Sequence, residues 1–252
     1  MEYDDAIDRF IELIDQSSRI VFFTGAGIST ESGIPDFRSP GTGIWTKIKP
    51  IEFQDFVASE KVRTESWRRK FKGNDGMLAA KPNLGHQAIS QLIRHGKAST
   101  VITQNVDNLH QKSGIPDEQV IELHGNAGYA KCLSCETRYE LAELHSQFKK
   151  LELIEPCRKC GGIIKTATIS FGQSMPPDAM NRAQAATIEC DLFVVVGSSL
   201  VVYPAAGFPE LAVQLDIPLV IVNREPTPLD SIATLAIHKE IGPTLSFVVG
   251  IN

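Results

Sequence analysis

The chain has 252 residues, of which 42% are hydrophobic and 22% are charged. This composition is typical of a folded globular protein and excludes a disordered or collagen-like chain. The formal net charge is −5, so the chain has no overall positive field to hold nucleic acid or an anionic membrane. At roughly 150 residues per domain, the length predicts one or two domains.

The sequence also predicts a cytoplasmic location. Residues 1–5 are acidic where a signal peptide would be basic, and no long apolar segment follows them. The most apolar stretch, 192–208, is interrupted by glycine, serine and proline, so we expect no membrane span. Five cysteines in a chain of this size argue against a secreted disulfide scaffold.

Apolar residues at helical spacing over 3–14 predict an amphipathic helix, which is followed by a buried strand at 20–24. Short apolar runs predict further strands at 100–103, 119–123, 192–196 and 218–222, and helical patterns lie at 85–94, 177–186 and 205–214. This alternation predicts an α/β fold, with a parallel sheet covered by helices on both faces.

Two segments interrupt the alternation. Residues 50–81 are charged and mixed, and they predict a helical excursion that ends in a flexible loop at 73–76. Residues 131–165 hold four of the five cysteines and few strong apolar runs, so we interpret them as a small inserted module.

The inserted module carries two Cys-x-x-Cys pairs, Cys132 with Cys135 and Cys157 with Cys160. Such pairs let both thiolates reach one ion from a tight turn, and four sulfurs favour a tetrahedral zinc ion. Four protein ligands leave no position for water, so the predicted zinc is structural. Cys190 precedes a buried strand, and we interpret it as a small core residue.

Polar residues follow several predicted strands. Because ligands of open parallel sheets bind beyond the carboxyl ends of the strands, these residues predict a binding site. Glycines 25 and 27 follow the first strand, an arrangement that can place backbone amides against a pyrophosphate, although a plain tight turn would look the same. His124 directly follows a strand and suits proton transfer near pH 7, whereas we interpret His110 as helical and structural. The remaining candidates are Asp36-Phe37-Arg38, 104–108, 197–199 and Asn223.

Together these residues resemble the sirtuin family of NAD-dependent protein deacylases. The matching blocks occur in the family's order and span nearly the whole chain: 25–29, 32–38, 103–110, 123–125, the four cysteines, 171–172, 197–205 and 222–223.

The resemblance implies a Rossmann-like large domain formed by 1–48, 82–128 and 166–252. It also implies a small lobe formed by a helical insertion, 49–81, and a zinc-ribbon module, 129–165. NAD and an acyl-lysine peptide or protein would meet in the cleft between them. From the acidic composition we expect no membrane partner and no direct binding of nucleic acid. The oligomeric state stays open, and a monomer is compatible with the sequence.

The resemblance further implies that Phe37 covers the nicotinamide site and that Val106 and Asp107 hold the carboxamide. The residues that it implies for NAD binding are Gly25, Ala26, Gly27, Ser29, Thr30, Asp36, Phe37, Arg38, Gln104, Asn105, Val106, Asp107, His124, Gly197, Ser198, Ser199, Asn223 and Glu240.

His124 and Asn105 are the implied catalytic residues. In the implied reaction, the acyl oxygen attacks the ribose carbon as nicotinamide leaves, which forms an O-alkylamidate. His124 then takes a proton through the ribose hydroxyls, so that a hydroxyl can attack the amidate carbon. The products are free lysine, nicotinamide and O-acyl-ADP-ribose. The peptide would add as a strand between two segments, Phe171-Gly172-Gln173 and Val201-Val202-Tyr203.

Two departures from the family pattern concern the substrate. Gln173 stands where the family more often has Glu, and no Tyr-x-x-Arg pair of the subset that prefers succinyl or malonyl groups is found near 67–70. We therefore expect an acetyl or a longer apolar acyl group. Two alternatives stay open: ADP-ribosyl transfer or hydrolysis of NAD at the same site, and a non-enzymatic zinc-ribbon adaptor that binds NAD.

Overall fold

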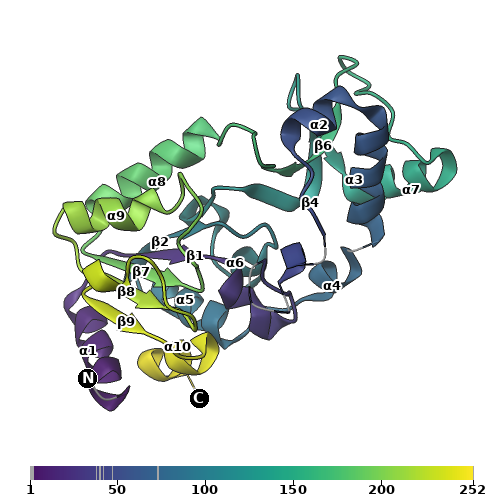
Figure 1. Ribbon diagram of the computed structural model, residues 1–252. Coiled ribbons are helices and arrows are strands. Elements are labelled where there is room, and N and C mark those ends of the chain that lie inside the picture. The colour runs from purple at the N-terminus through teal and green to yellow at the C-terminus, as the bar shows by residue number, and fades with distance from the viewer. Residues whose placement is uncertain are drawn as a thin grey trace.

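The structure is a computed structural model, and it describes residues 3–37, 39, 41, 43–46, 48–72 and 74–251. Figure 1 shows two lobes, the larger built around a six-stranded parallel sheet and the smaller around a three-stranded antiparallel sheet. The large sheet has the order β3-β2-β1-β7-β8-β9, with β1 Ile20–Thr24, β2 Ala98–Thr103, β3 Val120–Glu122, β7 Leu192–Val196, β8 Leu219–Val222 and β9 Leu235–Ile237. The small sheet has the order β5-β4-β6, with β4 Gly125–Cys132, β5 Arg138–Glu140 and β6 Ile164–Thr168.

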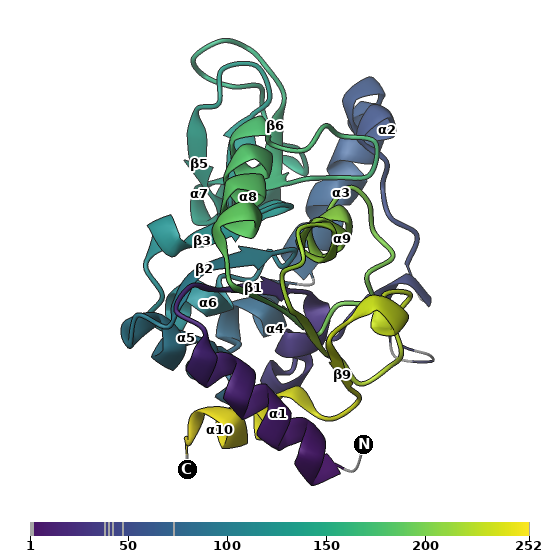
Figure 2. The ribbon, with the colours of Figure 1, turned by 90° about the vertical axis from the view of Figure 1, so that its left-hand side faces the viewer.

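Helices cover both faces of the large sheet, as the alternating pattern predicted. In Figures 1 and 2, α8 (Pro177–Glu189) and α9 (Gly207–Gln214) lie on one face. The other face carries α1 (Tyr3–Gln16), α5 (Leu84–Arg94) and α10 (Ile241–Val249). Both ends of the chain lie at the end of the large lobe remote from the small lobe, beyond α1 and α10 (Figures 1 and 2). Among the described residues, no helix is both long and apolar enough to cross a membrane.

The central strands are apolar on both sides because both of their faces are buried. In β1, Phe22 packs into the core on the side of α1, α5 and α10, whereas its neighbour Phe23 packs into the core on the side of α8 and α9. Successive side chains of a strand point to opposite faces, so a continuous apolar run is the expected pattern for such a strand.

The small lobe packs the antiparallel sheet against helices from two separate segments. Trp67 from α3 (Glu60–Lys72) and Leu144 from α7 (Leu141–Leu151) share one buried cluster with Tyr139 and two of the cysteines. The predicted domain boundaries stay a prediction, and β4 and β6 each cross one of them, because they span 125–132 and 164–168.

The remaining elements of the insertion are α2 (Phe53–Ala58) and α4 (Asn74–Ala79), and α6 (Leu109–Lys112) follows β2 in the large lobe. The prediction of a flexible loop at 73–76 was wrong for the described residues 74–76, which form the first turn of α4. The turn after β1 continues as a 3₁₀ helix, Ala26–Ser32, that ends at Gly33. Cys190 is buried in the core, as predicted.

Two buried histidines lie side by side between α5 and α6. His86 and His110 are 0% and 1% exposed, and their ring centroids are 5.1 Å apart. The structural interpretation of His110 is therefore confirmed. Burial lowers the pKa of His86 to about 4, and it also lowers the pKa of His110, with a further contribution from His86. Both rings are therefore neutral in the folded protein near pH 7.

This pair predicts a loss of stability in mild acid. The pKa of His86 is lower in the folded chain, so the unfolded chain binds its proton first as the pH falls below about 6.5. The His86 contribution is fully present above that pH and is lost as the pH falls toward 4. We expect His86 alone to lower the free energy of unfolding by roughly 2 kcal/mol between pH 7.5 and pH 5.0. Urea unfolding at both values should show a smaller pH effect for His86→Leu than for the wild type. An equal pH effect in the two proteins would refute this assignment.

Candidate active site

The candidate site lies where the strand order of the large sheet changes direction. After β1 the chain adds β2 and β3 on one side, and it later adds β7, β8 and β9 on the other side. Ligands of open α/β sheets bind in the crevice that forms at such a point. A cavity of about 610 Å³ opens there, beyond the ends of β1 and β7.

Glycines from two distant segments form the floor of this cavity. A Cβ atom at Gly25 would lie 2.6 Å from the carbonyl oxygen of Gly197, and one at Gly27 would lie 2.7 Å from the Cα atom of Gly197. Gly197 itself has φ +64°, and a Cβ atom there would meet the Ile28 nitrogen at 2.3 Å. Only glycine allows the turns after β1 and β7 to touch in this way.

The amides of these glycines are engaged within the protein. Gly25 donates to the carbonyl of Val196, Gly27 to that of Gly197, and Gly197 to that of Val222. The glycine pattern after β1 is therefore explained by the contact between two turns. The expectation that the amides of Gly25 and Gly27 face a pyrophosphate does not match these bonds.

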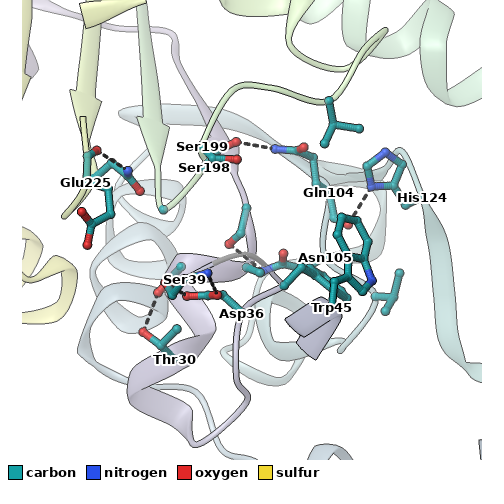
Figure 3. Close-up of a pocket in the computed structure, with 18 of the residues that line it drawn as sticks. Thr30, Asp36, Ser39, Trp45, Gln104, Asn105, His124, Ser198, Ser199 and Glu225 are labelled. Carbon is teal, nitrogen blue, oxygen red and sulfur yellow. Dashed lines mark hydrogen bonds between the residues drawn. The ribbon is translucent and has the colours of Figure 1, made fainter. Parts of the chain in front are cut away.

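His124 is held at the cavity by the neighbouring strand end. Its Nδ1 atom lies 3.0 Å from the carbonyl oxygen of Gln104, and the side-chain amide of Gln104 donates to Ser198 Oγ at 2.8 Å (Figure 3). A carbonyl oxygen only accepts, so Nδ1 carries the hydrogen. In the neutral ring, Nε2 is then the basic atom, and this is the tautomer that a general base requires.

A buried polar layer lies directly behind the cavity wall. Asn105 donates through Nδ2 to the carbonyl of Gly25 at 3.0 Å and to Ser29 Oγ at 3.2 Å. Ser29 in turn donates to Asp107 Oδ2 at 2.7 Å, and the other oxygen of Asp107 accepts from the amide of Leu109. Ser29 and Asp107 are 1% and 8% exposed, so they support the lining residues from behind rather than forming the surface.

Three aromatic rings form one side of the cavity. Trp45 lies between Phe37 and Phe171, with ring centroids 5.1 Å from each. Trp45 was not among the sequence candidates, because a single aromatic residue in a loop carries no spacing signal. Arg38, a candidate from the same loop, lies outside the described residues.

Charged residues gather at the opposite end of the cavity, after β8. Asn223 donates to the carbonyl of Glu225 at 2.6 Å, and Arg224 lies 3.8 Å from a carboxylate oxygen of Glu240. Asp36 accepts from the amide and the hydroxyl of Ser39. These residues all line the cavity (Figure 3 labels Asp36, Ser39 and Glu225).

The predicted peptide segments border the same cavity. Phe171, Gly172, Gln173, Val202 and Tyr203 line it, whereas Val201 is 49% exposed and is not among the described lining residues. The Gln173 side chain accepts from the amide of Ser170 at 3.2 Å, so it closes the turn that follows β6.

The cavity thus brings together most of the residues proposed from the sequence. The candidates that line it are Gly25, Ala26, Gly27, Thr30, Asp36, Phe37, Gln104, Asn105, Val106, His124, Phe171, Gly172, Gln173, Gly197, Ser198, Ser199, Val202, Tyr203, Asn223 and Glu240. Further lining residues that the sequence did not single out are Glu31, Ser39, Trp45, 168–170, Met175, Arg224, Glu225, Lys239 and Ile241.

The four cysteines of the small lobe form one cluster. Their sulfur atoms all lie within 4.8 Å of one another, with 3.5 Å between Cys132 and Cys160 and 3.7 Å between Cys135 and Cys157. A tetrahedral zinc ion with bonds of about 2.3 Å requires sulfur separations of about 3.8 Å, so the cluster fits one zinc ion. Gly161, at φ +73°, forms the turn after the second pair.

Tyr139 favours the thiolate form that zinc requires. Its hydroxyl donates to Cys157 Sγ at 3.1 Å and lowers the pKa of Cys157 to about 6. A thiolate is the metal-binding form of cysteine. The four cysteines are therefore positioned to bind one structural zinc ion.

Comparison with known proteins agrees with this geometry. The profile of the Sir2 family matches residues 25–204, and the chain belongs to the Sir2 family. "NAD-dependent protein deacetylase 1" of Bradyrhizobium diazoefficiens is 53% identical over 244 residues, which cover 97% of this chain and 95% of that protein. "NAD-dependent protein deacylase 2" of Archaeoglobus fulgidus is 40% identical over 247 residues, which cover 98% of this chain and 96% of that protein.

A solved structure of a Sir2 protein with a deacetylated p53 peptide and 3′-O-acetyl ADP-ribose superposes with a TM-score of 0.88. It is 37% identical in sequence and covers 98% of this chain and 99% of that chain. The fold predicted from the resemblance, a parallel sheet with helices on both faces and a small cysteine-containing lobe, is therefore confirmed.

Proposed function

We propose that this protein is an NAD-dependent protein-lysine deacylase that transfers an acyl group from lysine to ADP-ribose and releases nicotinamide. One observation carries the proposal: a single cavity holds His124 together with the ends of four neighbouring strands, β2, β1, β7 and β8. The names of the relatives, deacetylase and deacylase, support the same activity.

The cavity fits a dinucleotide in size and chemistry. A volume of about 610 Å³ lies within the usual range of about 300–1,000 Å³ for a small-molecule site. The glycine floor lets a ligand approach the backbone closely, while the hydroxyls of Ser198 and Ser199 and the amide of Asn223 line the walls. When bound, NAD supplies the ribose carbon that accepts the acyl oxygen, with nicotinamide as its leaving group.

Each residue that lines the cavity has a proposed role that follows from its position. His124, with its hydrogen on Nδ1, takes a proton through Nε2. Asn105 and Gln104 orient the nicotinamide ribose. Val106 lines the cavity and receives the carboxamide, and the buried Asp107 supports this loop from behind through Ser29 and the amide of Leu109. Phe37, with Trp45 beside it, covers the nicotinamide side and keeps water away from the reacting carbon.

The acyl-lysine peptide enters beside Phe171. Segments 171–173 and 201–203 offer backbone groups to an extended peptide, which binds largely independently of sequence. The apolar surroundings of Phe171 and Val202 favour an acetyl or longer apolar acyl group. We further propose that the protein acts in the cytoplasm on acyl-lysine proteins, without direct binding of nucleic acid or membrane.

Mass spectrometry of the products tests the function. An acetyl-lysine peptide should lose its acetyl group only when NAD is present, and O-acetyl-ADP-ribose should appear in equal amount. Free ADP-ribose with an intact acetyl-lysine would indicate hydrolysis. ADP-ribose attached to protein would indicate the alternative ADP-ribosyl transfer. Either pattern alone would refute deacylation.

A further inference from the structure

A hydrogen-bonded cluster joins the two loops that carry Gln104 and His124. Glu122, the last residue of β3, accepts from Gln111 Nε2 at 2.9 Å and from Asn126 Nδ2 at 2.7 Å. Both bonds end on the same oxygen atom, Oε1. Gln111 belongs to α6 and Asn126 to β4, so one atom ties three elements together.

Further bonds extend the connection along both loops. The side-chain amides of Asn108 and Asn126 bond to each other in both directions, and the amide of Gly128 donates to Asn126 Oδ1 at 2.7 Å. The amide of Ala127 donates to the carbonyl of Val106 at 2.9 Å. The loop 104–108 and the stretch 124–127 therefore lie side by side in a fixed register, and the bond from His124 to Gln104 lies within it.

Glu122 lies away from the proposed NAD cavity. With Asn126 it lines a second cavity of about 480 Å³, between α6, α8 and the small sheet. Burial raises the pKa of Glu122, which its two amide bonds oppose. Leaving a partly buried acceptor without its hydrogen-bond donors costs free energy, so these bonds hold Glu122, Gln111 and Asn126 in one geometry. Glu122 therefore acts on the geometry of the loops and does not contact the substrate.

We propose that Glu122 is a positioning residue for His124. Through Asn126 and Gln111 it holds the two loops in the register in which His124 Nδ1 donates to Gln104 and Nε2 is the base. This inference rests on the proposed function, because it assigns the role by which Glu122 serves the deacylation step.

Two substitutions at this position separate geometry from charge. Glu122→Gln keeps the Oε1 acceptor for both donors but removes the charge. Glu122→Leu removes the acceptor and leaves both amide donors unmatched. Glu118→Gln, which removes an exposed carboxylate four residues earlier, is the matched control.

The test measures the rate of nicotinamide exchange, the rate of peptide deacetylation and the NMR spectrum of the His124 ring. Exchange of labelled nicotinamide into NAD reports the step in which nicotinamide leaves, before His124 takes its proton, and peptide deacetylation reports the whole reaction. For Glu122→Leu we expect deacetylation to fall by roughly 10- to 100-fold and exchange by less than about 3-fold, since small misplacements of a reacting group carry losses of this size. Nitrogen NMR should show the Nδ1–H form of His124 in the wild type and in Glu122→Gln, and mixed tautomers in Glu122→Leu. The His124→Ala spectrum assigns the signal.

Several results would overturn the proposal. Equal losses of exchange and deacetylation in Glu122→Leu would indicate structural support only. An unchanged tautomer in Glu122→Leu, or a Glu122→Gln protein as impaired as Glu122→Leu, would also contradict it. A wild type that deacetylates no peptide would refute the proposed function, and the NMR comparison would still decide the positioning role.

A second variant covers the case in which Glu122→Leu does not fold. Asn126→Ala keeps Glu122 and its bond to Gln111 but removes the side chain that ties Glu122 to the stretch carrying His124. We expect the same mixed tautomers of His124 and a selective loss of deacetylation. Wild-type tautomer and activity in Asn126→Ala would overturn the proposal.

Discussion

Replacing His124 with alanine is expected to lower turnover of an acetyl-lysine peptide by roughly 10²- to 10⁴-fold, the usual contribution of a general base. Affinity for NAD should change little, because the ring hydrogen-bonds the Gln104 carbonyl but does not form the glycine floor or the walls around Ser198 and Asn223. Quantitative mass spectrometry of the peptide measures turnover, and calorimetric titration of NAD measures binding.

His95→Ala is the matched control for this experiment. His95 is exposed at the end of α5 and lies outside the cavity, so its removal should leave both turnover and NAD binding unchanged. A His124→Ala protein that keeps near wild-type turnover would remove the proposed base. Loss of NAD binding together with turnover would show that the substitution disturbs the site as a whole.

Replacing Cys132 with alanine is expected to abolish zinc binding and to unfold the small lobe. Structural zinc contributes apparent binding energies of roughly 10–16 kcal/mol in small zinc modules, and a three-ligand site loses most of that energy. The small lobe has a modest apolar cluster around Trp67 and Tyr139, which includes Cys132 itself. Deacetylation should therefore fall with zinc content, because β4 and β6 carry the segments next to His124 and Phe171.

Elemental analysis gives the zinc content, and protease digestion reports the state of the lobe. Cys190→Ala is the control, since Cys190 packs in the large lobe, and this protein should retain one zinc ion per chain. Dialysis of the wild type against a strong chelator should reproduce the Cys132→Ala behaviour. A zinc-free protein with a protease-resistant small lobe and full activity would contradict a structural role for the ion.

The central strands were predictable because burial on both faces leaves a distinct sequence signal. The runs at 20–24, 192–196 and 218–222 appear in the structure within one residue of the predicted bounds. β9, Leu235–Ile237, was missed, because only its last residue is β-branched and the segment gives no clear strand signal. The mostly apolar α10 was missed as well, since a buried helix lacks a polar face that would reveal its period.

The site was predictable where residues stand at strand ends, as His124 and Asn223 do. Contacts between distant segments were not predictable from pattern alone. Nothing near Gly25 indicates that Gly197, more than 170 residues later, occupies the space of its missing side chain. The position of Trp45 between two rings likewise depends on the folded path of its loop. The family resemblance identified the sequence segments that form the site. The fold explains why these segments lie together, because they follow neighbouring strands of one sheet.

The contact between the turns after β1 and β7 also bears on the energetics of ligand capture. Because Gly25, Gly27 and Gly197 are already bonded to the protein, this part of the binding surface has its final shape before any nucleotide arrives. When a nucleotide binds, the backbone at the base of the crevice therefore loses little conformational entropy. Differences in nucleotide affinity among variants of this chain should therefore arise mainly from the side chains and loops above the base.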